Sequence, residues 1–411
     1  MDMKRKLPIF NTAPLIILGG GVHQIPYILF CKKNKIPTLV IDQDKKCLAK
    51  TYADYMLNIK TPNSKSLNVF NKIKKITKKT GVKGVLVAGV ELAVLGSFLA
   101  KKFKTKGIDP FTAIVATNKI KRSIELKKKK IPISEFKVFK KIETIKNKFP
   151  FVIKTEYGSG SRGVCIVLSK TDLIFVKNQF SKVKSSKFIV EDFLTGYEIS
   201  IEAFIYKKKF YYYCFAIRDI EILSKGKIIE HGSISDPLHD KQSIDKVKKI
   251  FEKGCFAIGL KEGPAKGDIL FTKLGPKIIE IAARSAPLAP LISKKVYNFD
   301  MISAHIRWSM GLNPFLNSKP IDYFKTKPVC HKYLSHKKGT LCKVNGIEKI
   351  KKLKNVIKVI VLRDLKYPMK LDEPNNTNRL LYVVTTGSNA NNARSNAVKS
   401  LSKIQLLYKQ S

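Results

Sequence analysis

In the N-terminal part of the chain, short apolar runs alternate with glycine turns and with stretches whose apolar residues recur at helical spacing. The expected strands are Leu15–Leu18, 37–42 and 84–88, and the expected helices are Ile25–Lys33 and the stretch that carries Val69, Phe70, Ile73 and Ile76. Strands that alternate with helices in this way build βαβ units. The pattern therefore predicts an N-terminal α/β domain of Rossmann type over residues 1–112.

The pattern changes beyond residue 113, where long strands with alternating apolar positions replace the βαβ order. Helices are expected at 116–130, 245–258 and 301–310, and strands at 187–194, 197–206, 209–217 and along a hairpin at 265–284 whose arms join through Gly275-Pro276. Antiparallel strands combined with separate helices are typical of α+β domains. We therefore expect an α+β domain over residues 113–315, with subdomains at about 113–188 and 189–315.

A further unit is expected from residue 316 to residue 411. It contains short strands at 358–362 and 380–385 and a closing helix. Ala393, Ala397, Leu401 and Ile404 share one face of that helix, and Ser388 or Asn389 is the expected N-cap.

A glycine-rich stretch, Gly-Ser-Gly-Ser-Arg-Gly at 158–163, follows the apolar strand that delivers Lys154. Three glycines in six residues cost conformational entropy on folding, which a simple solvated turn does not require. Their backbone N–H groups could bind an anion, with Ser159, Ser161 and Arg162 as side-chain donors. From these residues alone, a phosphate cradle and a mobile hairpin tip both remain open.

Two carboxylates lie on opposite arms of the 265–284 hairpin. One strand register places Asp268 opposite Ile281, and a shift by one residue places it opposite Glu280. We predict the second register, because it makes the two carboxylates cross-strand neighbours that could share a cation. In a β-strand, alternate side chains point to the same face, which places Glu280, Ala282 and Arg284 on one face of the hairpin. This face is either a surface with a salt bridge or a site for Mg²⁺, which prefers hard oxygen ligands.

The turn after the first strand partly matches a dinucleotide-binding motif. Gly19 and Gly21 are present and Asp42 follows, but Gln24 stands where the third glycine belongs. A structural role in a Rossmann-type domain is therefore favoured over NAD binding.

Composition limits the classes of function open to the chain. The net charge is +48, yet only nine of the 79 basic residues are arginines, and the lysines are spread along the whole length. Base-specific readers of nucleic acids usually use arginine forks, so we expect no specific nucleic-acid partner and only weak, salt-sensitive attraction to polyanions. No apolar run reaches the roughly 20 residues that span a bilayer. The seven dispersed cysteines fit reduced thiols, so we expect a cytoplasmic protein without a membrane partner.

Six motifs, in order along nearly the entire chain, resemble the ATP-grasp superfamily and its carboxylate–amine ligases. They are Asn118-Lys119, "PFVIK" at 150–154, "GSGSRGV" at 158–164, "VEDFLTGYEIS" at 190–200, Asp268, and "IIEIAAR" at 278–284. The resemblance implies a Rossmann-like pre-ATP-grasp domain, a two-part ATP-grasp clamp and a C-terminal lid-like region. It also favours the phosphate-binding interpretation of residues 158–163, as the mobile flap of the family.

The resemblance implies a role for each matching residue. In the bound ATP, the α- and β-phosphates would contact Lys119 and Lys154, and the β- and γ-phosphates would be covered by Ser159, Gly160, Ser161, Arg162 and Gly163. The adenine edge would be bound by Glu191, Asp192 and Leu194, and the ribose by Glu198. Asp268 and Glu280 would hold Mg²⁺, and Arg284 would face the reacting carboxylate or acyl phosphate. Arg284 and Arg162 are thus the candidate catalytic residues.

The sequence departs from the family pattern in two places. Ala282 occupies the position where an asparagine often supplies a third metal ligand, and Ser285-Ala286-Pro287 replaces a Gly-Gly turn. The second metal ion and the shape of the acceptor pocket are therefore open.

The resemblance implies an ATP-dependent ligase that joins a small-molecule carboxylate to an amine through an acyl phosphate and releases ADP and phosphate. The alternatives are another ATP-grasp chemistry, such as bicarbonate activation or purine-pathway ligation, and a non-catalytic protein that binds nucleotides or nucleic acids. ATP and Mg²⁺ are the implied cofactors, and a homo-oligomer is left open.

Overall fold

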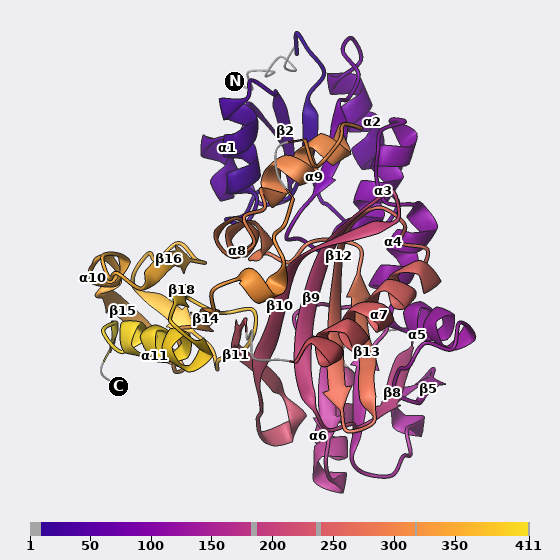
Figure 1. The fold of residues 1–411 in the computed structure, drawn as a ribbon, viewed down its shortest axis with the longest axis vertical. Coiled ribbons are helices and arrows are strands. Elements are labelled where there is room, and N and C mark those ends of the chain that lie inside the picture. Colours follow the sequence, from indigo (N-terminus) through magenta and orange to yellow (C-terminus); the bar gives the residue numbers. More distant parts are fainter. Residues whose placement is uncertain (1–9, 182–186, 236–239, 317–318, 410–411) are drawn as a thin grey trace.

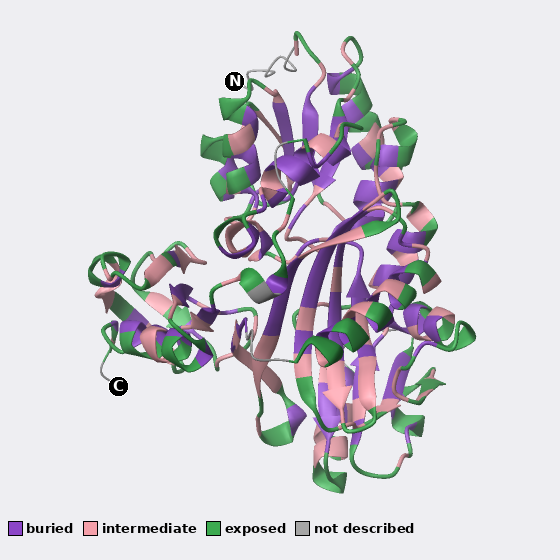
Figure 2. Cartoon of the chain, viewed as in Figure 1, coloured by how far each residue is buried: buried purple, intermediate pink, exposed green. Residues whose placement is uncertain are grey.

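The computed structural model describes residues 10–181, 187–235, 240–316 and 319–409. Figure 1 shows an N-terminal α/β part at the top, a large twisted sheet in the centre and a C-terminal part on the left. Buried residues concentrate on the strands of the central sheet and of the N-terminal part, while the helices turn exposed faces outward (Figure 2). The chain is thus layered around sheets, as the alternating pattern predicts.

The N-terminal part is a four-stranded parallel sheet with the order β3-β2-β1-β4. Its strands are β1 (Leu15–Leu18), β2 (Thr38–Asp42), β3 (Tyr55–Asn58) and β4 (Gly84–Val87), and its helices are α1 (Ile25–Lys33), α2 (Leu67–Ile76) and α3 (Ala93–Lys102). Helix α9 (Met301–Ser309), which comes much later in the sequence, packs against α1 and β4. Ile306 of α9 is fully buried in the core beneath this sheet, so the N-terminal part is joined firmly to the rest of the chain.

The turn that partly matches a dinucleotide motif is filled by its own side chains. The Gln24 amide accepts a hydrogen bond from the N–H of Gly21 (3.0 Å) and donates one to the carbonyl of Ala88 (2.5 Å). Asp42 accepts a hydrogen bond from the N–H of Gly20 at 2.7 Å. Both polar groups therefore stabilise the loop itself, which favours its structural role.

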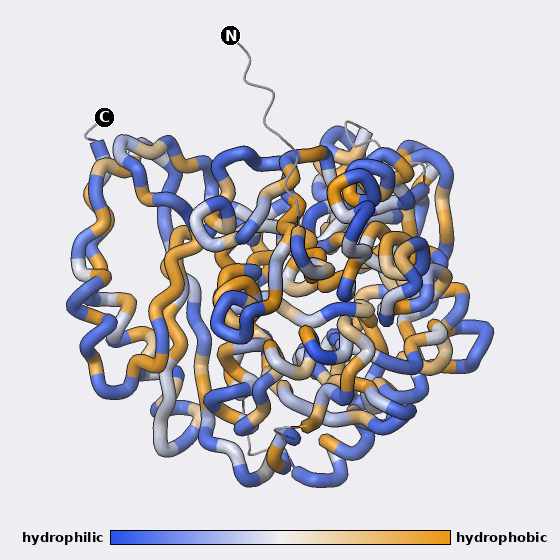
Figure 3. The backbone as a smooth tube through the Cα atoms, turned by 90° about the horizontal axis from the view of Figure 1, so that it is seen from above, coloured by the Kyte–Doolittle hydropathy of each residue, from blue (hydrophilic) through white to orange (hydrophobic). Residues whose placement is uncertain are grey.

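The central sheet has eight strands in the order β13-β12-β9-β10-β11-β14-β18-β16, and every neighbouring pair is antiparallel. Its strands are β9 (Tyr197–Tyr206), β10 (Lys209–Ile222), β11 (Ile228–Ile234), β12 (Gly263–Thr272), β13 (Gly275–Ala282), β14 (Val329–Tyr333), β16 (Val356–Val361) and β18 (Leu381–Thr386). Helices α7 (Lys241–Ala257) and α8 (Ala289–Val296) pack against it. Seen from above, hydrophilic segments of the backbone lie mostly at the outside and hydrophobic segments mostly toward the interior (Figure 3).

A smaller antiparallel sheet lies beside the central one. Its strands, in the order β5-β8-β6-β7, are β5 (Phe136–Phe139), β8 (Phe188–Asp192), β6 (Phe151–Thr155) and β7 (Val164–Val167). Helix α6 (Lys170–Phe180) packs on this sheet through Val176 and Phe180. The loop at 158–163 joins β6 to β7, at the end of the strand that carries Lys154.

The C-terminal part does not form a separate layer, since three of its strands, β14, β18 and β16, continue the central sheet. The remaining elements are a three-stranded sheet of β17 (Met369–Leu371), β15 (Gly339–Asn345) and β19 (Gln405–Tyr408), with helices α10 (Ile347–Lys351) and α11 (Ala390–Leu401). Asn389 caps α11 by accepting a hydrogen bond from the N–H of Asn392. Ile404 lies beyond the end of that helix, contrary to the sequence prediction, and the strand β19 follows.

The single helix predicted at 116–130 is wrong. The chain instead forms α4 (Pro110–Thr117) and α5 (Lys119–Lys128), with Asn118 between them. The Asn118 side chain caps α5 by accepting a hydrogen bond from the N–H of Lys121 at 2.9 Å. An asparagine is more favourable at an N-cap than in a helix interior, which explains the break.

The hairpin register is confirmed, because Asp268 lies directly opposite Glu280. The predicted junction at Gly275-Pro276 is wrong, since the turn consists of Lys273 and Leu274 and β13 already begins at Gly275. Ile279 has no partner on β12, and this register shift lets Asp268 pair with Glu280 while Thr272 pairs with Gly275 at the turn. Such a bulge adds one residue to one strand and changes the direction of the neighbouring side chains.

Within the residues described, no helix is both long enough and apolar enough to cross a membrane.

Candidate active site

A cavity of about 560 Å³ lies where the four parts of the fold meet. Its wall includes the loop after β4, the loop at 158–163, the face formed by β9, β10, β12 and β13, and the C-terminal strands β14 and β18. The structure brings nine of the predicted site residues to this wall: Lys119, Lys154, Ser159, Gly160, Ser161, Glu198, Asp268, Glu280 and Arg284. Distant sequence motifs thus converge on a single cavity.

Residues 158–163, which we call the flap, form a tight loop that places Ser159, Gly160 and Ser161 on the cavity wall. Gly158, Gly160 and Gly163 all have positive φ angles, which glycine adopts without strain. A side chain at Gly163 would also collide with Thr155, because a Cβ there would lie 2.2 Å from its Oγ1. The glycines are therefore required by the shape of the loop.

Arg162 does not face the main cavity. It lines a smaller adjoining cavity of about 300 Å³, and its guanidinium donates hydrogen bonds back to Ser159, to the carbonyl at 3.1 Å and to Oγ at 3.2 Å. Gly163 does not line the main cavity either. In this conformation the flap presents serine hydroxyls to the cavity, while its arginine holds the flap together.

Lys119 is the first residue of α5 and is buried beside the flap. Its Nζ donates a hydrogen bond to the carbonyl of Gly158 at 2.8 Å. Burial lowers the pKa of the Lys119 ammonium to about 8. A buried ammonium gains most from an anionic partner, and the N-terminus of a helix also favours anions.

Lys154 lies on β6 and forms an ion pair with Glu191 of β8, with Nζ 2.6 Å from Oε2. This contact links the buried lysine to the stretch predicted to hold the adenine edge. Glu191, Asp192 and Leu194 do not themselves line the cavity, and Asp192 is exposed to solvent. Their predicted role therefore remains a prediction.

Asp268 and Glu280 form the acidic floor of the cavity. Asp268 is only 5% exposed and Ser200 of β9 lies opposite it on its other side. Burial alone would raise the pKa of the Asp268 carboxyl, but the Lys266 ammonium and the Arg218 guanidinium lower it to about 2. Burial would also raise the pKa of Glu280, and Arg122 and Lys266 lower it below the usual value. Both groups are therefore carboxylates at neutral pH.

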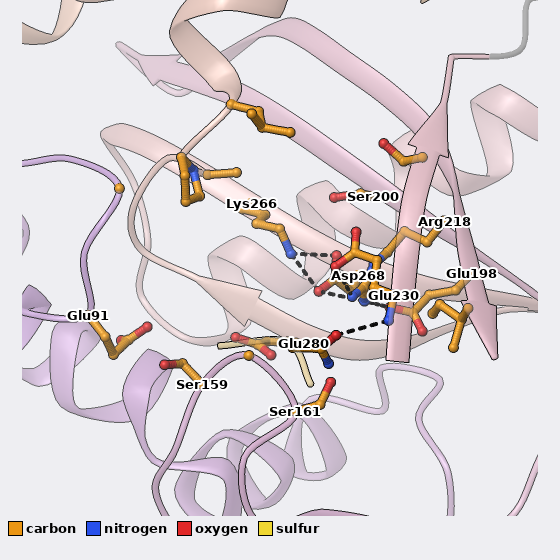
Figure 4. Close-up of a pocket in the computed structure, with 18 of the residues that line it drawn as sticks. Glu91, Ser159, Ser161, Glu198, Ser200, Arg218, Glu230, Lys266, Asp268 and Glu280 are labelled. Atoms are coloured by element: carbon orange, nitrogen blue, oxygen red, sulfur yellow. Dashed lines mark hydrogen bonds and ion pairs between the residues drawn. The ribbon is translucent and has the colours of Figure 1, made fainter. Parts of the chain in front are cut away.

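Figure 4 shows Asp268 between Lys266 and Arg218, with Glu280 on the side that faces Ser159 and Ser161 of the flap. The Lys266 Nζ lies 2.5 Å from the Asp268 carboxylate, and an Arg218 nitrogen lies 3.6 Å from it. Arg218 also pairs with Glu198 and, at 3.0 Å, with Glu230. The ribose candidate Glu198 is thus one member of a network of buried charges.

The residues present fit one Mg²⁺ ion. A magnesium ion typically takes one or two carboxylates and completes its octahedron with water and substrate phosphates, which Asp268 and Glu280 could allow. Ala282 is buried, lies opposite Lys266 and supplies no ligand oxygen. No group of three or more His, Cys, Asp or Glu side chains placed to hold a metal occurs in the described ranges. The two carboxylates could therefore share one ion, provided that water and a bound phosphate group supply the remaining oxygen ligands.

Arg284, directly after β13, already holds a carboxylate. Its Nε and Nη2 lie 2.9 Å and 2.8 Å from Oε2 of Glu91, which comes from the loop after β4. The guanidinium is largely buried, with 13% of its side chain exposed. Both nitrogens reach the same carboxylate oxygen, and a guanidinium in this place could bind another carboxylate in the same way.

Sequence reasoning missed several charged residues of this site: Arg122, Arg218, Glu202, Glu230, Lys266, Arg363 and Arg379. The rarity of arginine in this sequence could have pointed to some of these residues. Of the nine arginines, Arg122, Arg162, Arg218, Arg284, Arg363 and Arg379 line the main or the adjoining cavity. In a chain whose usual cation is lysine, arginine marks positions where a planar, multidentate cation is useful.

The C-terminal strands supply an aromatic and basic end to the cavity. The Arg379 guanidinium stacks over Tyr333, 3.5 Å from the ring centroid, and donates a hydrogen bond to Asn376 at 2.8 Å. His331 Nδ1 contacts the Ser233 hydroxyl at 2.7 Å. In the part of the chain that the structure describes, His331 Nε2 and the Tyr382 hydroxyl are buried without a hydrogen-bond partner.

A family model matches the part of the chain that contains Lys119, Lys154, the flap and Glu198. Residues 97–225 match the model of the TupA-like ATPgrasp family. A curated relative, the uncharacterized protein y4rH of Sinorhizobium fredii, is 22% identical over 297 residues, which cover 67% of this chain. The match spans 58% of the length of that relative.

Solved structures match nearly the whole chain. L-amino acid ligase from Bacillus licheniformis has a TM-score of 0.82 at 16% identity, covering 97% of this chain and 99% of the ligase. The biotin carboxylase domain of 2-oxoglutarate carboxylase from Hydrogenobacter thermophilus, a structure with MgADP and bicarbonate, has a TM-score of 0.71 at 13% identity, covering 98% and 92% of the two chains. Together with the family match, these structures confirm the predicted resemblance, and the chain has the ATP-grasp fold.

Proposed function

We propose that this protein is an ATP-dependent ligase that joins a carboxylate to an amine through an acyl phosphate and releases ADP and phosphate. One observation carries the proposal. The flap, an acidic pair opposed across a hairpin and an arginine that grips a carboxylate all line the same cavity. Phosphoryl transfer depends mainly on positioning and charge neutralisation, and these groups supply both.

Each group has a task in binding ATP. Lys119 and Lys154 would neutralise phosphate charge from the small-sheet side, and the flap would add backbone N–H groups and the serine hydroxyls. Asp268 and Glu280 would hold Mg²⁺, which supplies charge neutralisation at the β- and γ-phosphates. Lys266 and Arg218 keep the Asp268 carboxylate ionised before the cation binds.

The carboxylate substrate would replace Glu91 in the grip of Arg284. From there, a carboxylate oxygen attacks the γ-phosphorus, the bond to the bridging oxygen of ADP breaks, and an acyl phosphate results. The amine then attacks the acyl carbon, and the carbon–oxygen bond breaks to release phosphate. No protein nucleophile is needed: Arg284 would hold the attacking carboxylate in place and would then stabilise the negative charge that develops on the acyl oxygen when the amine attacks.

The comparisons support this choice of reaction class. L-amino acid ligase matches across the whole chain, and the carboxylase domain binds MgADP and bicarbonate on a similar fold. A fold alone hosts many reactions, so the residues of the cavity carry the argument. Bicarbonate activation remains the main alternative within the fold.

The proposal predicts phosphate release that requires both substrates. With ATP and Mg²⁺, a screen of carboxylates crossed with amines should identify a pair that raises phosphate release at least about tenfold, the equivalent of 1.4 kcal/mol in barrier height. Chromatography should show ADP as the nucleotide product. Accumulation of AMP and pyrophosphate would contradict the mechanism, and stimulation by bicarbonate alone would favour the alternative.

A further inference from the structure

Glu202 is a buried acid on the cavity wall to which no predicted motif assigned a role. It lies on β9, four residues after Glu198, and is only 2% exposed. Its Oε2 accepts hydrogen bonds from the N–H of Ala286 (2.9 Å) and the hydroxyl of Tyr213 (3.3 Å). Its Oε1 has no hydrogen-bond partner among the described residues. One carboxylate oxygen is therefore held in place and the other is available to a ligand.

The other acids of the cavity are occupied. Glu91 forms an ion pair with Arg284, and Asp268 forms one with Lys266. Arg218 forms ion pairs with both Glu198 and Glu230. Among the cavity acids in the described ranges, only Glu202 and Glu280 have no ion pair, and Glu280 belongs to the proposed magnesium site. Burial lowers the pKa of His23 and of His331 to about 4, so these imidazoles are weak bases.

The surroundings of Glu202 suit a base that works near neutral pH. Burial raises the pKa of its carboxyl to about 7. The hydrogen bond from the backbone N–H of Ala286 and the positive charges of Lys266 and Arg284 limit that rise. The charged and titratable groups that face it are Lys266 from β12, Arg284 after β13, Tyr213 and Cys214 from β10, Tyr27 from α1 and Tyr297 after α8. A general base is most effective when its pKa lies near the working pH.

We propose that Glu202 binds the amine substrate as its ammonium ion and removes one proton before the amine attacks. This inference rests on the proposed ligase function. An alkylammonium ion has no lone pair, so it must lose a proton to become a nucleophile. Glu202 Oε1 takes that proton, the nitrogen lone pair forms the carbon–nitrogen bond, and the carbon–oxygen bond to phosphate breaks. The departing phosphate takes the second proton, and the amide keeps the third.

Hydroxylamine separates this role from a structural one, because it is largely neutral at neutral pH and attacks acyl phosphates without a base. The Glu202→Gln variant keeps an amide oxygen that can accept the Ala286 N–H but cannot accept a proton. With the best carboxylate of the screen, ATP and Mg²⁺, amide formation from a mixture of proteinogenic amino acids is compared with hydroxamate formation. We expect Glu202→Gln to lower amide formation about 100-fold, as loss of a general base typically does, and hydroxamate formation by less than about threefold.

The pH profile gives a second readout. In the wild type, amide formation should rise as the pH passes through about 7, because Glu202 must be a carboxylate to accept a proton. This limb should be absent from Glu202→Gln. Tyr213→Phe is the matched control, since it removes a hydrogen bond to Glu202 and keeps the carboxylate. It should keep the pH-dependent limb of amide formation, at a pH no lower than in the wild type, because the Tyr213 hydrogen bond lowers the pKa of Glu202.

The outcomes distinguish a failure of the Glu202 proposal from a failure of the proposed ligase function. Equal loss of both products in Glu202→Gln, or unchanged amide formation, would overturn the role of Glu202 and leave the ligase function standing. A wild-type protein that forms neither product with any carboxylate would overturn the ligase function and the Glu202 proposal together.

Discussion

Replacing Asp268 by Asn or Glu280 by Gln is expected to lower kcat by about three orders of magnitude, because a neutral amide is a poor ligand for a hard dication and the lost stabilisation is several kcal/mol. The two residues face each other across the hairpin, and the Ala282 side chain offers no oxygen that could compensate as a third ligand. Each variant should also need a higher Mg²⁺ concentration for half-maximal activity. Phosphate release measured across a magnesium titration tests both effects.

Folding must be controlled in this experiment, because Asp268→Asn leaves the buried cations Lys266 and Arg218 with one partner fewer. Circular dichroism and binding of a fluorescent ADP analogue without metal should match the wild type. Asp245→Asn on α7 is the matched control, since its side chain is 56% exposed and lies outside the cavity. Full activity in both Asp268→Asn and Glu280→Gln would refute the metal assignment.

Replacing Arg284 by Lys is expected to lower kcat/KM for the carboxylate about 100-fold, while the KM for ATP stays within about twofold. Lysine keeps the charge but loses the pair of N–H groups that now lie 2.8 and 2.9 Å from one Glu91 oxygen. The effect should therefore fall on the substrate carboxylate and on the developing charge at the transition state, and steady-state kinetics in both substrates separates these constants.

Arg307→Lys is the matched control for Arg284→Lys. Its guanidinium donates a hydrogen bond to the carbonyl of Asn313, and the residue does not line the cavity. This variant should keep both kinetic constants. An Arg284→Lys enzyme with unchanged carboxylate kinetics, or one that loses only ATP affinity, would show that Arg284 does not bind the acid.

Local patterns in the sequence were sufficient to predict the strands that carry part of the site. Periodicity identified the strands that carry Lys154, Asp268 and Glu280, and the structure has the register that we chose of two possible ones because it makes the two acids neighbours. The turn was misplaced because Gly275-Pro276 is a typical turn dipeptide, although in the structure Gly275, with a positive φ, begins β13. The bulge at Ile279 allows the tight turn and the Asp268–Glu280 pairing to coexist, and no local signal marks such a bulge.

The order of the central sheet could not be predicted in the same way. Arg218 meets Glu230 because β10 lies beside β11, and His331 and Tyr333 reach the cavity because β14 pairs with β11 across a long stretch of sequence. Such neighbours depend on how the whole sheet closes over its core, so the buried charge network and the C-terminal wall were missed. The resemblance supplied the roles of the motif residues, but it gave no information about Glu202.

The central claim is that the carboxylate oxygen attacks the γ-phosphorus of ATP, and transfer of an isotopic label tests it most directly. The best carboxylate of the screen is labelled with ¹⁸O in both carboxyl oxygens and allowed to react with ATP, Mg²⁺ and the amine in unlabelled water. If an acyl phosphate forms, the carbon–oxygen bond breaks on the carbonyl side, so mass spectrometry of the released phosphate should show one ¹⁸O per molecule formed. Label in AMP would prove adenylation, and phosphate without label would show that water, not the carboxylate, attacks ATP.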